Sequence, residues 1–177
     1  MSDYSEGQTH QLMKTLQPEG FTKKEVTKLG QFPKLGDFRM VLSGLAEIKV
    51  VEHIIDLDAD PFVPSGWGVE EHKRGGLFKW DPKQVRLHLD PGQQNGKCIE
   101  GNELRKRLAG KPVLNANVLD CLLANPQLIP EEWKGKFVFF WGTIYRVSDG
   151  GLCVRCLDWG GGRGSWGYRW LGRGFGG

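Results

Sequence analysis

Hydrophobic and polar positions from residue 136 onward fall into three short strand-like runs, KFVFFWGTIYRV, GLCVRCLDW and SWGYRWLG. Asp149-Gly150, between the first two runs, is a strong hairpin signal, and a glycine-rich segment separates the second run from the third. The pattern predicts a three-stranded antiparallel meander over residues 136–171. Residues 137–140 are all apolar, so we expect the first strand to be central in its sheet or covered by a helix.

Before the meander, the spacing of apolar residues becomes helical. The segment PVLNANVLDCLLANP predicts a helix over residues 114–124, which Pro126 ends. Four apolar side chains share one face of this helix: Leu114, Val118, Cys121 and Leu122. A shorter helix is predicted from Asn102 to Leu108.

Three short helices are predicted near the N-terminus. The first covers THQLMKTL. The second begins at Thr22, which caps the backbone while Glu25 reaches back to it, and ends at Gly30. The third begins at Asp37 and ends at Gly44.

The central region has a mixed pattern. AEIKVVEHIIDLDADPF is rich in β-branched residues and predicts a strand that ends at Pro61. Farther along, Val85, Leu87 and Leu89 alternate with polar residues, which predicts a half-buried strand.

These elements predict an α+β fold. N-terminal helices and a mixed central region precede the helix at 114–124, which we expect to pack near the C-terminal meander. The domain organisation predicted is a polar N-terminal segment at 1–20, a single α+β domain at 21–171 and a glycine-rich tail at 172–177.

Composition and charge narrow the class of protein. Hydrophobic residues make up 39% of the 177 residues, which indicates a globular chain. No apolar stretch approaches the ~20 residues of a membrane helix, and the start has no signal-peptide pattern. We therefore expect a cytoplasmic protein with no membrane partner and with reduced cysteines. From residue 137 onward, five arginines against two aspartates account for the whole formal net charge of +3, a mild signal for anionic partners.

Three stretches also resemble a known group of proteins: VVEHIIDLDADPFVPSGWGVEEHKRGG, GKCIEGNELRKRL and KPVLNANVLDCLLANPQLIPEEWKGKFVFFWGTIYRVSDGGLCVRCLDW. Over residues 47–171 the chain resembles a family of uncharacterised bacterial proteins predicted mainly from metagenomic genomes of candidate phyla. The ending after Trp159 is richer in glycine than the Trp- and Asp-bearing ends of that family. The resemblance implies a bacterial origin and no particular activity, cofactor or catalytic residue.

The acidic run HIIDLDADPF is the best candidate for metal chemistry. On a strand, Asp56, Asp58 and Asp60 would share one face, and three like charges in a row suit a hard cation such as Mg²⁺. With His53 as a neighbouring base or ligand, these residues would form the site of a metal-dependent enzyme acting on nucleic acid. The alternative is a solvated strand end that runs into a proline turn.

Cys153 and Cys156 form a C-x-x-C pair, which is typical of zinc and redox sites. The pair lies in the middle of a predicted strand, where residues three apart point to opposite faces. We therefore expect neither metal binding nor redox exchange, and interpret both cysteines as strand residues.

Aromatic and arginine side chains alternate along the meander and form the main candidate binding site. The candidate residues are Arg146, Arg155, Trp159, Trp166, Tyr168, Arg169 and Trp170. They would provide a stacking surface for a single-stranded nucleic acid or a sugar. In the opposite interpretation, the aromatic rings form the core between sheet and helices and the arginines lie at its edge.

The function predicted is a non-catalytic intracellular binding module that needs no cofactor, because the chain lacks the usual nucleophile, phosphate-loop and zinc-ligand motifs. Its expected partner is a protein or a single-stranded nucleic acid. Two alternatives stay open. One is the metal-dependent enzyme at Asp56, Asp58 and Asp60, and the other is a weak single-stranded RNA or DNA binder that uses the aromatic–arginine sheet.

Overall fold

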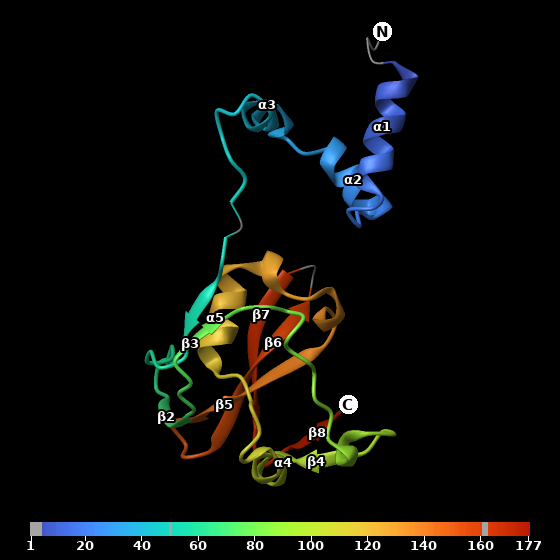
Figure 1. Ribbon diagram of the computed structural model, residues 1–177. Coiled ribbons are helices and arrows are strands. Elements are labelled where there is room, and N and C mark those ends of the chain that lie inside the picture. Colours follow the sequence, from blue (N-terminus) through green and yellow to red (C-terminus); the bar gives the residue numbers. More distant parts are fainter. Residues whose placement is uncertain (1–4, 50, 161–162) are drawn as a thin grey trace. The chain divides into compact units, whose positions relative to one another are not determined.

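The residues described by the computed structural model, 5–49, 51–160 and 163–177, fall into two units that divide at residue 51 (Figure 1). The first unit is Met1–Val51 and the second is Glu52–Gly177. This boundary differs from the one predicted at residue 20, because the helices up to residue 42 belong with the first unit.

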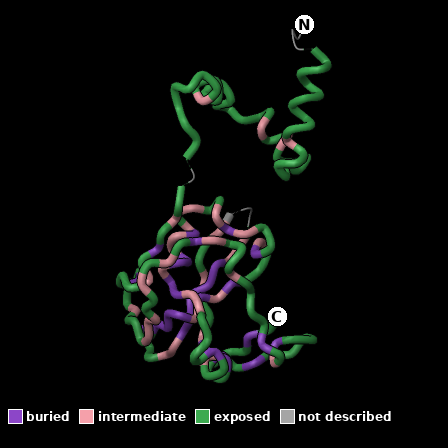
Figure 2. The backbone as a smooth tube through the Cα atoms, in the orientation of Figure 1, coloured by how far each residue is buried: buried purple, intermediate pink, exposed green. Residues whose placement is uncertain are grey.

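Short helices make up the first unit. They are α1 (Glu6–Leu16), α2 (Lys23–Gly30) and α3 (Phe38–Leu42), with a 3-10 turn at Leu35–Asp37. The predicted start at Thr22 is confirmed, since Thr22 and Glu25 bond to each other's backbone in a capping box. Asp37 precedes α3 but its side chain makes no capping hydrogen bond. No described residue of this unit is buried (Figure 2), so these helices have no core of their own.

The second unit is built on a four-stranded antiparallel sheet of order β2-β5-β6-β7. Its strands are β2 (Gly68–His72), β5 (Phe137–Arg146), β6 (Leu152–Gly160) and β7 (Arg163–Trp170). Strands β5, β6 and β7 are the predicted meander, and β2 adds to its open edge. The hairpin predicted at Asp149-Gly150 is present, and Gly150 takes a positive φ of 86° there.

Two small antiparallel pairs complete the strands that the structure describes. One joins β1 (Ile54–Asp56) to β3 (Leu77–Lys79), and the other joins β4 (Cys98–Glu100) to β8 (Gly174–Gly176). Strand β8 lies in the predicted glycine-rich tail. Its central residue, Phe175, is buried, so the end of the chain is part of the domain and not a free tail.

The central strands were predicted too long. Among the described residues of the run from 46 to Pro61, only Ile54–Asp56 form a strand, because the backbone turns at the aspartates that follow. The strand predicted at Val85, Leu87 and Leu89 is wrong: no strand in the described part of the chain pairs with this segment, and both leucines are exposed. Alternation alone cannot form a strand without a neighbour to pair with.

Two core clusters lie on the two faces of the four-stranded sheet. The second unit has two helices among its described residues, α4 (Gly101–Leu108) and α5 (Ala116–Ala124). Its 3-10 turns lie at Pro91–Gln93, Pro126–Leu128 and Glu131–Trp133. On one face, Leu119 and Leu122 of α5 pack in one core cluster with Phe140 of β5 and Leu157 of β6. This confirms the predicted packing of the helix at 114–124 near the meander.

The second face is covered by α4 together with β4 and β8. Leu104 and Leu108 of α4 share a core cluster with Phe175 of β8 and with Ile144 and Val154 of the sheet. Strand β5 is therefore covered on both sides and lies between β2 and β6, as its apolar start predicted. Buried residues gather in this second unit (Figure 2). No helix in the described ranges has the length and apolar character needed to cross a bilayer.

Asn115 holds the first turn of α5 against the sheet. Its side-chain oxygen accepts a hydrogen bond from the Asn117 amide, and its side-chain nitrogen donates to the carbonyl oxygens of Leu57 and Lys73 at 3.0 and 2.9 Å. The Gly142 amide in turn donates to the Leu114 carbonyl at 2.8 Å. The helix N-terminus is thus bonded to β5 and to the segments around β1 and β2.

Gly142 is the place where this contact is closest, because a Cβ there would lie 2.8 Å from the Asn115 backbone nitrogen. We expect Gly142→Ala to lower the free energy of unfolding by about 2 kcal/mol, since backbone must move to admit the methyl group. Denaturant unfolding measures the loss. Gly68→Ala is the matched control, because a Cβ at this strand glycine meets nothing within 4 Å. An equal loss in both variants would contradict the close contact.

Candidate binding surface

Arg155 lies in the middle of β6 with only 1% of its surface exposed. Its partner is Asp120 of α5: Nη2 donates to Asp120 Oδ1 at 2.7 Å and Nη1 donates to Oδ2 at 3.2 Å. Burial by itself lowers the pKa of the guanidinium, but the neighbouring Asp120 and Tyr145 outweigh this and raise the pKa overall. The ion pair therefore ties the centre of the sheet to the helix that covers it.

Aromatic rings flank the same guanidinium. Its central carbon lies 5.1 Å from the centroid of the Phe62 ring and 4.9 Å from that of Trp166. Both distances are in the range of cation–π attraction. Nε of Arg155 is buried and has no hydrogen-bond partner in the described part of the chain.

We call Phe62, Trp67, Trp166 and Tyr168 the aromatic surface. Trp67 is at its centre, with edge-to-face contacts to Trp166 at 6.3 Å and to Tyr168 at 5.0 Å between ring centroids. Phe62, Trp166 and Tyr168 keep 54%, 39% and 47% of their surface exposed. The surface is therefore ordered by ring packing and still open to a partner.

Tyr145 supports the aromatic surface from below. It is fully buried, its ring contacts Trp67 at 5.6 Å, and its hydroxyl donates to the Phe62 carbonyl at 3.1 Å. Burial raises the pKa of this phenol, so the hydroxyl keeps its proton and remains a donor. The loop that presents Phe62 is thereby fixed to β5.

The structure divides the seven candidate residues between the two faces of the sheet. The register of β6 and β7 places Arg155, Trp159, Trp166, Tyr168 and Trp170 on the face that α5 covers. Of these, Trp166 and Tyr168 are exposed, Arg155 is buried, and Lys134 lies 4.9 Å above the partly buried Trp159 ring. Buried core and open surface thus meet on this face of the sheet.

Arg146 and Arg169 lie on the opposite face. Arg146 pairs with Glu70 at 2.8 Å and donates to the Gly150 carbonyl, while the Arg169 guanidinium lies 5.4 Å from the Phe175 ring. They cannot act together with Trp166 and Tyr168 on one ligand group. Phe62 and Trp67 were not predicted, because they come from a loop and a turn far from the meander in sequence.

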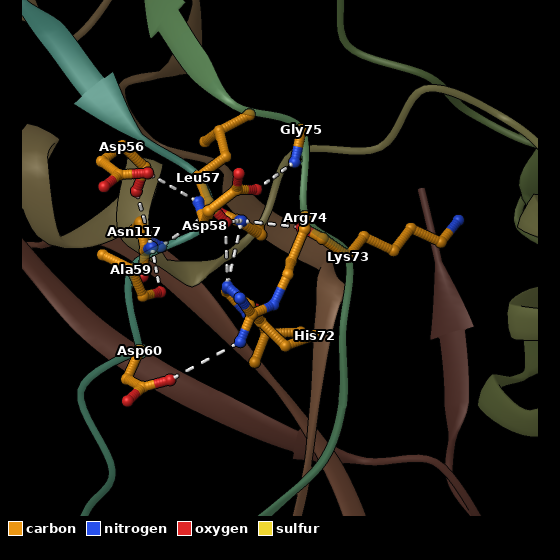
Figure 3. Close-up of polar contacts among 12 residues, drawn as sticks. Asp56, Leu57, Asp58, Ala59, Asp60, His72, Lys73, Arg74, Gly75 and Asn117 are labelled. Carbon is orange, nitrogen blue, oxygen red and sulfur yellow. Dashed lines mark hydrogen bonds and ion pairs between the residues drawn. The ribbon is translucent and has the colours of Figure 1, made fainter.

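The three aspartates do not converge (Figure 3). Asp56 accepts a hydrogen bond from the Asp58 amide at 2.8 Å, which turns the chain directly after β1. Asp58 accepts from the Gly76 and Gly75 amides at 3.0 and 2.9 Å, and these bonds lower its pKa. In the described ranges, no three His, Cys, Asp or Glu side chains gather as metal ligands would.

Asp60 and His53 lie apart from any shared site. Asp60 is almost fully exposed and its carboxylate is 3.9 Å from Arg74. His53 lies just before β1, where its carbonyl accepts a bond from the Trp80 amide at 2.8 Å. The idea of three carboxylates on one strand face is therefore corrected, because the strand ends at Asp56 and a hydrogen-bonded loop follows.

Asn117 gives this acidic loop a structural role. Its side-chain nitrogen donates to the Asp56 carbonyl at 2.9 Å and to the Ala59 carbonyl at 2.8 Å (Figure 3). The loop is thus held between the first turn of α5 and the backbone at Gly75 and Gly76. It leads directly to Phe62, so these bonds help to place the aromatic surface.

A second polar cluster, which was not predicted, lies behind that loop. His72 Nε2 is 3.1 Å from the Leu57 carbonyl oxygen and 3.3 Å from the Asn115 side-chain nitrogen. His72 Nδ1 is 2.8 Å from the Thr143 hydroxyl, which also accepts from the Ala116 amide at 2.9 Å. Each nitrogen of the ring has a partner, and the cluster joins β2, β5 and α5.

Cys153 and Cys156 are buried and belong to opposite faces of β6, as their spacing predicted. Cys153 is opposite Tyr145 and Trp170 in the ladder, whereas Cys156 is opposite Phe139 and Gly167. Burial raises the pKa of Cys153 to about 12 and that of Cys156 to about 11. Both remain neutral thiols at ordinary pH, which suits neither metal binding nor exchange chemistry.

No protein-family model, curated protein or solved structure matches this chain. The resemblance of residues 47–171 to a bacterial family stays a prediction. The fold is α+β, and the aromatic surface with the ion pair beneath it is the feature on which a functional proposal rests.

The ion pair has two unequal partners, because Arg155 is buried while the Asp120 side chain keeps about a third of its exposure. We expect Asp120→Asn to lower the free energy of unfolding by about 2 kcal/mol or more, since it leaves a buried charge uncompensated. Arg155→Met should cost about 1 kcal/mol, because water can solvate the remaining carboxylate. Denaturant unfolding compares the two.

Asp158→Asn is the control for this comparison. Asp158 lies on the same strand, is partly exposed and has no salt-bridge partner in the described residues, so its change should stay within about 0.5 kcal/mol. A larger loss in Arg155→Met than in Asp120→Asn would contradict the assignment of the buried charge as the costly partner.

The thiols should differ sharply in reactivity. Cys98 is exposed, so Ellman's reagent at about pH 8 should react with it rapidly in the folded protein. Cys153 and Cys156 should react only after unfolding, and the half-buried Cys121 slowly. Cys98→Ser should remove the rapid phase. Rapid reaction of two further thiols in that variant would show that the C-x-x-C pair is reactive.

Proposed function

We propose that the chain is a non-catalytic binding module that recognises an apolar, proline-rich peptide segment of a partner protein through the aromatic surface. The observation that supports this most is the exposure of the Phe62, Trp166 and Tyr168 rings, which pack edge to face with one another or with Trp67. Exposed Trp and Tyr edges form the grooves in which proline rings dock in other peptide-binding domains. A proline-rich segment is already extended before binding, so little conformational entropy is lost.

Charge favours a peptide over a nucleic acid at this surface. Binding to single strands needs cations that neutralise phosphates beside the stacking rings. Arg155 is neutralised by Asp120, and Arg146 and Arg169 lie on the opposite face. A partner here is therefore expected to be uncharged where it meets the rings.

The metal-dependent enzyme has little support from the geometry. Asp56 and Asp58 are used in the turns of their own loop, and Asp60 points to solvent beside Arg74. The hydrogen bonds of this loop explain its acidic residues without chemistry. The cytoplasmic location expected from the sequence stays a prediction.

NMR of the indole N–H groups tests the proposal. We expect a short polyproline peptide to shift the signals of Trp67 and Trp166 and to leave those of the buried Trp80 and Trp133 unchanged. Tyr168→Ala should weaken the binding at least about fivefold, since it removes one of the exposed rings of the aromatic surface.

Phe137→Ala is the matched control, because Phe137 is also an exposed aromatic strand residue but lies on the other face of the sheet. It should bind the peptide like the unchanged protein. Shifts of Trp67 and Trp166 with a short oligothymidylate but not with the peptide would assign a nucleic acid to this surface and overturn the proposal. The absence of any shift with the peptide would also contradict it.

A further inference from the structure

A groove lies between α4 and the edge strand β2, on the face of the sheet opposite the aromatic surface. Its volume is about 360 Å³, within the range of small-molecule sites. Strand β2 and its end contribute Glu71 and Lys73, strand β5 contributes Trp141, and α4 contributes Arg105 and Lys106. Polar and aromatic groups from three elements thus converge on one concave space.

The groove has an excess of positive charge. Three cationic side chains and one carboxylate line it. Arg105 donates to Oε2 of Glu71 from Nε at 3.1 Å and from Nη2 at 2.6 Å. This pair links α4 to β2, and its two charges neutralise each other. Two lysines remain to attract an anion.

The two lysines differ in how far they are already paired. Lys106 is 4.0 Å from Glu103, which is itself bonded to Arg107, so its charge is only weakly compensated. Lys73 has no salt-bridge partner among the residues that the structure describes, and Figure 3 shows its side chain extending away from the three aspartates. Its ammonium group is therefore available to a ligand in the groove.

The groove also has an apolar wall. Trp141 is partly buried and contacts Phe175 at 5.1 Å between ring centroids, which fixes the indole against the core. Leu108 and Val113 line the groove beside it. The face of a fixed indole can stack with the planar ring of any nucleic-acid base.

From these groups we infer that the groove binds a nucleotide unit, with the planar base against Trp141 and the phosphate between Lys73 and Lys106. The unit comes either from a free mononucleotide or from one residue of a single strand, and both present the same ring and phosphate. This site is independent of the aromatic surface, because it uses other residues on the other face of the sheet.

Titration with adenosine monophosphate, followed by the indole N–H signal of Trp141, tests the inference. We expect a shift of Trp141 without a shift of Trp67 or Trp166, and an affinity that falls as salt is raised. Lys73→Gln and Lys106→Gln should each weaken binding roughly tenfold, since each removes a charged hydrogen-bond donor to the phosphate. Lys97→Gln, an exposed lysine outside the groove, is the control and should bind as before.

Adenosine, inorganic phosphate and a short oligoadenylate complete the experiment. Equal binding of adenosine and its monophosphate would contradict the role of the lysines, and equal binding of inorganic phosphate would contradict the role of Trp141. Tighter binding of the oligoadenylate than of the monophosphate assigns the site to a strand, and the reverse assigns it to the free nucleotide. No shift of Trp141 with any of these probes would overturn the inference.

Discussion

A guanidinium buried in the centre of a β-sheet needs an opposite charge close by, and here Asp120 of helix α5 supplies it. Arg155 of β6 is held by both oxygens of Asp120, so the helix must cross the sheet at this point. The hydrogen bonds of Asn115 fix the N-terminal end of the same helix. Helix α5 is thus bonded to the sheet at two places, and the packing of Leu119 and Leu122 fills the space between them.

The aromatic surface depends on the same arrangement. Phe62 and Trp166 contact each other edge to face and both lie near the Arg155 guanidinium, so their position depends on that of the buried charge. Phe62 belongs to a loop whose start is bonded by Asn117 of α5 and by Asp58. The acidic residues that suggest a metal site in the sequence therefore have a structural role, which is to hold the loop that presents Phe62.

Local patterns predicted the elements that depend on local forces. The meander, the hairpin at Asp149-Gly150, the capping box at Thr22 and the helix at 114–124 all follow from periodicity, turn residues and caps. The strand β8 was missed, because GFG has no strand pattern and becomes a strand only by pairing with β4. The strand predicted over the three aspartates was too long, since side-chain hydrogen bonds to the backbone outweigh the alternation there.

The candidate site was predicted in composition but not in arrangement. Trp166 and Tyr168 are in the aromatic surface, whereas the register places Arg146 and Arg169 on the opposite face. Phe62, Trp67 and the groove residues Lys73 and Lys106 come from segments far apart in sequence. The packing of α4 and α5 on the two faces of the sheet brings these residues together. The periodicity of a single sequence does not reveal such contacts between distant segments.

If the Arg155–Asp120 pair orders the aromatic surface, the indole N–H spectrum of Asp120→Asn should change at that surface. Asparagine keeps the size of the side chain and removes the charge. We expect the Trp67 and Trp166 signals to move or broaden while those of Trp80 and Trp133, in the core, keep their positions. A folded variant in which all four signals stay unchanged would contradict it.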